Sequence, residues 1–154
     1  MNMAYELCQD GDYKKALKYF DLILQEMPTN INALIDKGVT LQNLNKLESS
    51  LKLYNKALEL EPNNIDALVN KGSSLHSLGK YIEAINCYDL ALKIDKNCTM
   101  ALAYKGLSLG ELGQVQDALK LFKQSLELDR NYDLAQISHK KALEILKASR
   151  IMEI

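Results

Sequence analysis

The chain has 154 residues, of which 47% are hydrophobic and 25% charged, a balance typical of one folded domain and not of a disordered chain. Its 19 basic and 20 acidic residues give a net charge of −1, which argues against a nucleic-acid binder or a polybasic membrane anchor. It has no apolar run long enough to span a bilayer, and residues 1–10 show no secretory signal, so we expect a protein that stays off membranes.

In chain order, the sequence predicts helix pairs that repeat. Residues 1–30 form a partial first pair, in which Ala4 stands where later pairs have glycine. Three full pairs follow at 31–64, 65–98 and 99–132. A lone helix is expected at 133–148, where it would cap the last pair, and the tail at 149–154 has no assigned partner.

The repeat has a period of 34 residues. Glycine recurs at that step as Gly38, Gly72 and Gly106. Other columns keep the same step: Phe20, Tyr54, Tyr88 and Phe122; Leu17, Leu51, Ile85 and Leu119; Leu41, Leu75, Leu109 and Leu143. Several columns sharing one period make a chance match untenable and indicate a repeat architecture.

Each period contains two amphipathic stripes separated by a turn. In residues 65–98, apolar residues recur at steps of three and four before Gly79 and again after it. Gly79 is free to take the positive φ of a tight turn. Pro28 and Pro62 stand in two of the breaks between periods, and every break contains an asparagine. We expect the asparagines to cap the following helices.

The recurring glycine lies inside a predicted helix, where it costs about 1 kcal/mol relative to alanine. Its repetition therefore predicts a close approach between helices, with the aromatic residue of the second helix packed against it. A lone helix pair cannot bury its apolar face, so the pairs must stack.

These features resemble the tetratricopeptide repeat family from about residue 1 to residue 148. The glycine column, the small and aromatic residues of the second helix (such as Ala84, Tyr88 and Ala91) and the closing Pro28 and Pro62 carry the resemblance. The sequence departs from the family pattern where Leu41, Leu75 and Leu109 replace an aromatic residue and where Lys96 and Arg130 replace proline. The resemblance implies an all-α, right-handed solenoid of about four repeats plus a capping helix, in a single domain at 1–154.

The resemblance also implies that the first helices line a concave groove that binds a peptide or helix of a partner protein. Four columns of residues would line it, and they include Met1, Asn2, Tyr5, Ile35, Val69, Ala103 and Ser138. We expect the peptide-binding residues to be Asn32, Asp36, Asn43, Asp66, Asn70, Ser73, His76, Tyr104 and Leu107. Asn70 and its column neighbours could hydrogen-bond a peptide backbone, since an amide both donates and accepts; the alternative is that each is simply a solvated polar residue on an exposed helix face.

One subfamily binds acidic chaperone tails through lysines, asparagines and an arginine in these columns. Here no lysine or arginine stands in them before the capping helix, and Asp36 and Asp66 would repel an acidic ligand. We therefore expect a ligand that is neutral or basic at the polar end of the groove and carries an apolar anchor near Tyr104 and Leu107.

The later part of the groove is predicted to be apolar. Met100, Leu134 and Ile137 would form an exposed patch beside Tyr104, and such patches usually mark a partner site. This gives an alternative function, a scaffold that self-associates to build a larger complex. Alternatively, the tail at 151–154 folds back over the patch.

Catalysis is not expected. The sequence has no phosphate-binding loop, HExxH motif or paired carboxylates, and spacing brings no thiol to His76 or His139. Cys8, Cys87 and Cys98 form no CxxC pair, so we expect no metal or other cofactor, and free thiols favour a cytoplasmic location. An RNA-binding helical repeat is disfavoured by the period of 34 and by the lack of a basic groove.

Overall fold

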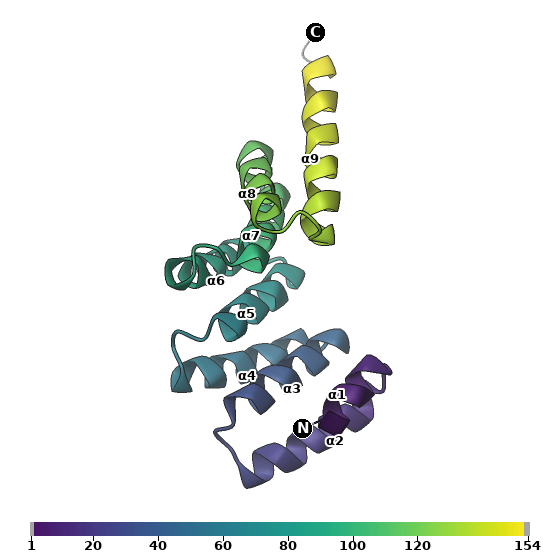
Figure 1. Cartoon of the computed structure of the whole chain (residues 1–154), viewed down its shortest axis with the longest axis vertical. Helices are drawn as coiled ribbons and strands as arrows, with labels where there is room; N and C mark the ends of the chain where they lie inside the picture. Colours follow the sequence, from purple (N-terminus) through teal and green to yellow (C-terminus); the bar gives the residue numbers. More distant parts are fainter. Residues whose placement is uncertain (1, 153–154) are drawn as a thin grey trace. The chain divides into compact units, whose positions relative to one another are not determined.

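The structure is a computed structural model that describes residues 2–152, without the side chains of residues 2, 5 and 150–152. The described part of the chain is helical and contains no strand, as predicted (Figure 1). Its helices are α1 (Asn2–Gln9), α2 (Tyr13–Glu26), α3 (Ile31–Asn43), α4 (Leu47–Leu60), α5 (Ile65–Ser77), α6 (Tyr81–Ile94), α7 (Thr99–Glu111), α8 (Val115–Leu128) and α9 (Asp133–Met152).

The turn inside each helix pair depends on one residue with positive φ. Gly11, Gly79 and Gly113 have φ between 75° and 79°, and Asn45 takes the same position with φ 57°. These residues are spaced by the 34-residue period. Asparagine tolerates the left-handed region better than most residues, so the second repeat turns without glycine.

Asparagine caps only some of the first helices. Asn30 and Asn64 accept hydrogen bonds from the backbone N–H of Ala33 and Ala67, at 3.0 and 2.9 Å. Cys98 occupies the same position before α7, and its side chain makes no capping bond. The expectation that an asparagine caps the helix after every break was therefore wrong for α7, because Asn97 lies one residue before the N-cap position.

The chain divides into two compact units, residues 1–78 and residues 79–154, which are described separately. In the N-terminal unit, α3 and α4 lie side by side and α5 packs on α4 (Figure 1). Leu34, Tyr54, Ala57 and Ala67 form a core cluster between them. A Cβ at Gly38 would stand 2.5 Å from Cε1 of Tyr54, which confirms the predicted glycine–aromatic contact.

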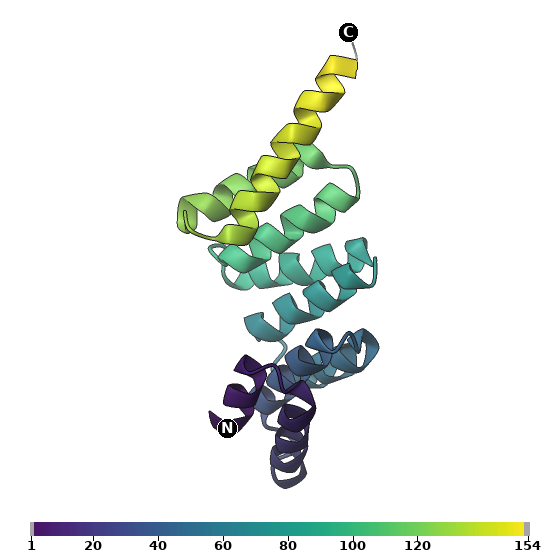
Figure 2. The same cartoon turned by 90° about the vertical axis from the view of Figure 1, so that its right-hand side faces the viewer.

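In the C-terminal unit, α7 packs against α6 and α8, and α9 packs along α8 (Figure 2). The core here contains Ala118, Phe122 and Ala142. A Cβ at Gly106 would stand 2.6 Å from Cε1 of Phe122, so the same contact recurs in this unit.

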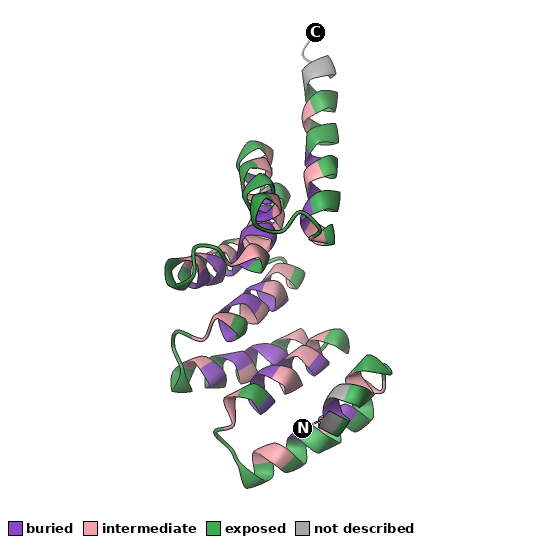
Figure 3. Ribbon diagram, in the orientation of Figure 1, coloured by how far each residue is buried: buried purple, intermediate pink, exposed green. Residues whose placement is uncertain are grey.

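Helix α9 is longer than the predicted capping helix at 133–148. It reaches Met152, so part of the expected tail is helical, while residues 153–154 lie outside the described residues. Its buried stripe contains Ala135 and Ala142 (Figure 3).

The other side of α9 is exposed and largely polar. Gln136 and Lys140 stand there, at the positions that the buried Leu102 and Gly106 hold in α7. Leu143 is 39% exposed, although its column neighbours Leu41 and Leu75 are at most 8% exposed.

Candidate functional site

The predicted polar residues of the N-terminal unit lie at the surface of α3 and α5, and we call this set the polar face. Each of its members is exposed or half-buried: Asn32, Asp36, Asn43, Asp66, Asn70, Ser73 and His76. The helical period brings residues three and four apart onto one side of a helix, which is why Asp36 shares a side with Asn32 and Asn43.

One of the four predicted columns does not line this face. Ile35, Val69 and Ala103 are at most 6% exposed and belong to the core. The prediction placed them in the groove and was wrong, because their side chains are packed into the core, as Ile35 is in the cluster with Tyr54 and Ala67. Ser138, in another column, is also buried, whereas Ile137 is 68% exposed on the last helix.

A hydrogen-bond chain joins three helices beneath the polar face. The hydroxyl of Tyr54 on α4 donates to Oε1 of Gln42 on α3 at 3.2 Å, and Nε2 of Gln42 donates to Oγ of Ser73 on α5 at 2.9 Å. Burial raises the pKa of Tyr54 well above its usual range, and the nearby Asp36 carboxylate raises it further. Gln42 thus positions Ser73, a role that the 34-residue pattern does not reveal, since His76 and Gly110 occupy its column.

Carboxylates dominate the electrostatics of the polar face. Lys37, the only basic residue of α3, is directed to Asp21 on α2, with Nζ 2.5 Å from the carboxylate oxygen. Lys105 and Asp89 repeat this ion pair at 2.6 Å in the C-terminal unit. Lys37 and Lys105 therefore contact second helices, while Asp36 and Asp66 place two carboxylates on the polar face and Lys71 of α5 is half-buried.

In the C-terminal unit, the predicted apolar residues lie on α7 and α9, and we call this set the apolar face. Met100 and Ile137 are 42% and 68% exposed. Tyr104, Leu107 and Leu134 are half-buried. All five are accessible, so the C-terminal unit presents the apolar character expected of it.

Tyr104 of the apolar face lies close to other tyrosines. The ring of Tyr104 stacks on that of Tyr88, with centroids 6.1 Å apart and planes inclined by 17°. Burial raises the pKa of Tyr132 to about 12, and Tyr104, Cys98 and Asp129 contribute to the rise. This neighbourhood of tyrosines was not predicted, because their spacing in sequence follows no single column.

Other residues of the predicted groove cannot be placed. Met1 lies outside the described residues, and so do the side chains of Asn2 and Tyr5.

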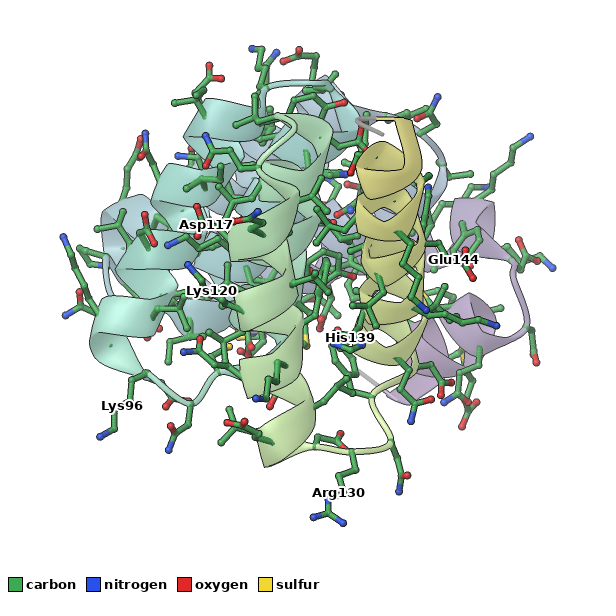
Figure 4. The ribbon with its side chains drawn as sticks, turned by 90° about the horizontal axis from the view of Figure 1, so that it is seen from above. Lys96, Asp117, Lys120, Arg130, His139 and Glu144 are labelled. Carbon is green, nitrogen blue, oxygen red and sulfur yellow. The ribbon has the colours of Figure 1, made fainter. Side chains whose placement is uncertain are left out.

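The structure places Cys8, Cys87 and His139 in separate surroundings. Cys8 Sγ lies 3.5 Å from Thr40 Oγ1, and Cys87 is buried. His139 lies on the side of α9 that faces α8, whereas Glu144 points away from α8 (Figure 4). Within residues 2–152, no group of three or more His, Cys, Asp or Glu side chains could hold a metal ion. None of the described helices combines the length and apolar character that crossing a membrane requires.

Comparison with protein families identifies the repeat. The family model described as "Anaphase-promoting complex, cyclosome, subunit 3" matches residues 9–91, and the tetratricopeptide repeat model matches residues 101–132. The chain belongs to the tetratricopeptide repeat family. Together with the helix pairs, this confirms the resemblance and the all-α fold class predicted from the 34-residue period. No curated protein matches this chain in sequence.

Solved structures of other tetratricopeptide repeat proteins share the fold. A crystal structure of MamA is 19% identical with a TM-score of 0.77, and the match covers 94% of this chain and 79% of that one. MamA 41-end from Desulfovibrio magneticus RS-1 is 20% identical with a TM-score of 0.76, covering 99% and 90%.

A third similar structure contains a ligand. It is the first tetratricopeptide repeat domain of Spaghetti (RPAP3) bound to the HSP90 peptide SRMEEVD, at 24% identity and a TM-score of 0.72, covering 76% of this chain and 93% of that one. At these identities the similarity shows a shared fold, and proteins of this family are in general non-catalytic interaction modules.

Proposed function

We propose that this protein is a non-catalytic interaction module whose first helices bind an extended segment of a partner protein. The polar face of the N-terminal unit carries the proposal, because its seven predicted residues are all accessible while the neighbouring column of Ile35 and Val69 is buried. Asn70 can donate to and accept from a peptide backbone, and Asp36 can accept from backbone or side-chain N–H groups.

The charge of the polar face favours a neutral or basic segment. The SRMEEVD peptide bound by the Spaghetti domain carries three carboxylate side chains. Here Asp36 and Asp66 would meet such a peptide with like charge, and the basic residue of α3 is engaged with Asp21. The binding mode we propose is therefore distinct from capture of an acidic tail.

The test uses display of short random peptides on the full chain, followed by calorimetry with the selected peptides. Replacing Asp36 and Asn70 together by alanine should weaken binding roughly tenfold or more, because two hydrogen-bonding groups are lost. The melting temperature should stay within a few degrees, since neither side chain belongs to the core.

A matched control is available on α4. Asn55 and Glu59 are likewise an amide and a carboxylate, and both are exposed. The Asn55→Ala and Glu59→Ala double variant should bind the peptides as the wild type does. Unchanged affinity in the Asp36/Asn70 variant, or selection of mainly acidic peptides, would contradict the proposal.

The apolar face supports a second candidate function, self-association into a larger assembly. Ile137 is 68% exposed on α9 and Met100 is 42% exposed on α7. Exposed apolar side chains that cluster usually mark a contact with another protein surface, which a second copy of the chain could supply.

A further inference from the structure

The helical glycines of α7 differ in their surroundings. Gly106 is required by the close approach of Phe122. A Cβ at Gly110, one helical turn later, would meet no atom within 4 Å, and Gly110 has no positive φ. Neither steric contact nor backbone conformation therefore explains why a residue as unfavourable to helices as glycine stands at position 110.

Gly110 lines a cavity of about 100 Å³ between α7, α8 and α9. Leu107, Val115, Phe122 and Ile145 supply its apolar lining. The second and third repeats hold Gln42 and His76 at the position of Gly110. In the N-terminal unit, Gln42 also accepts a hydrogen bond from the hydroxyl of Tyr54. Phe122, at the equivalent position, has no hydroxyl that would need such a partner.

The cavity has a closed floor and an open rim. Phe122 and Ala142 of its floor are 3% and 6% exposed, whereas Ile145 at its rim is 47% exposed. Glu111 and Lys141 also line the rim, and both are exposed. Neither takes part in an ion pair among the described residues.

We propose that this cavity binds one aliphatic side chain of an extended partner segment. The inference rests on the proposed function, because Leu107, one of the residues expected to bind the partner segment, also lines the cavity. A volume of about 100 Å³ suits a single side chain, since apolar cavities of roughly 150 Å³ hold a benzene molecule. At the rim, Glu111 can accept from a backbone N–H of the segment and Lys141 can donate to a carbonyl.

The residues that follow the cavity on α9 do not fill it. Helix α9 continues without a break from Ile145 to Met152, a rise of about 10 Å along its axis. Residues 146–152 therefore extend away from Gly110 and do not occupy the cavity. The occupant we propose is a segment of a partner protein.

The experiment fills the cavity from within by Gly110→Leu. The melting temperature should not fall, because leucine favours helix and the site has space for its Cβ. Millimolar benzene should shift the methyl NMR signals of Leu107, Val115 and Ile145 in the wild type and not in the variant. Peptides selected on the wild type should share one aliphatic residue and bind Gly110→Leu roughly tenfold more weakly.

Two further variants serve as controls for this experiment. Gln116→Leu adds a leucine at an exposed position of α8 outside the cavity, and it should bind both benzene and peptide as the wild type does. Gly110→Ala fills the cavity by one methyl group only and should give an intermediate loss of peptide affinity, even if Gly110→Leu fails to fold.

The outcomes separate this inference from the proposed function. Selected peptides that bind wild type and Gly110→Leu equally would overturn the cavity as an anchor site and leave the polar face as proposed. A wild type that selects no peptide would overturn the proposed function and the peptide occupant with it. A wild-type dimer that Gly110→Leu dissolves would identify a second copy as the occupant and would equally overturn the inference.

Discussion

Glycine at two positions of one helix serves opposite purposes in this protein. At Gly106 the hydrogen in place of a side chain lets the ring of Phe122 approach the backbone of α7, and Gly38 does the same for Tyr54. At Gly110 the missing side chain leaves space next to the same ring. Residue identity alone does not distinguish these cases, because the difference lies in the atoms that surround each Cα.

Alanine substitution at the two positions should therefore change stability in opposite directions. Gly106→Ala places a Cβ 2.6 Å from Cε1 of Phe122, and overpacking of this kind costs about 1–3 kcal/mol, more than the gain of about 1 kcal/mol in helix propensity. Gly110→Ala meets no atom within 4 Å and should stabilise the protein by up to about 1 kcal/mol. Thermal unfolding of both variants measures the difference, and a fall in stability for Gly110→Ala would contradict the open site.

At the scale of the helix, α7 differs from α3 and α5 in the residue at its N-cap position. The residue before α7 has φ −64° and ψ 95°, close to the values of −70° and 101° at Asn30. The backbone is thus ready for a capping side chain, but the thiol of Cys98 makes no capping bond. An N–H group of the first turn of α7 therefore lacks the partner that Ala33 and Ala67 have.

Cys98→Asn should stabilise the protein by about 0.5–1 kcal/mol, because the amide oxygen can accept from the backbone N–H of Ala101 as Asn30 does for Ala33. Asn64→Ala should cost about 1 kcal/mol for the same reason. Urea unfolding reports both changes. Asn63→Ala, one residue before the cap and exposed, is the control and should leave the midpoint unchanged; equal effects of Asn63→Ala and Asn64→Ala would show that the cap is not the cause.

At the scale of the whole molecule, the polar face and the apolar face belong to different units. The polar face lies on α3 and α5, and the apolar face lies on α7 and α9. A balanced net charge of −1 provides little long-range repulsion between copies of the chain, so charge would not oppose the self-association proposed for the apolar face.

Self-association through the apolar face predicts a solution mass that rises with protein concentration. Ile137→Lys and Leu134→Lys should each restore the mass of a single chain, because a charge buried in an apolar interface is strongly unfavourable. Sedimentation over a concentration series measures this, with Lys52→Glu on the exposed side of α4 as a charge-change control. A single-chain mass at every concentration would rule out self-association and leave the apolar face open to a partner segment.

The sequence by itself determined the helices, their pairing and the contacts that the period repeats. Apolar spacing predicted the helix pairs, and the step from Gly38 to Gly106 predicted a close aromatic contact that the structure shows in both units. These features follow from local geometry, since helical period and turn conformation depend on residues near one another in the chain.

Only the tertiary structure decided which side of each first helix stays accessible. Ile35 and Val69 are buried although their neighbours Asp36 and Asn70 are accessible, because burial depends on which side chains from elsewhere in the fold pack against each side of the helix. The bond from Gln42 to Ser73 and the cavity beside Gly110 join residues from different helices, and no column of the repeat contains them together. Periodicity records what the repeats share, whereas these features arise where one repeat differs from the next and must be read from the packing itself.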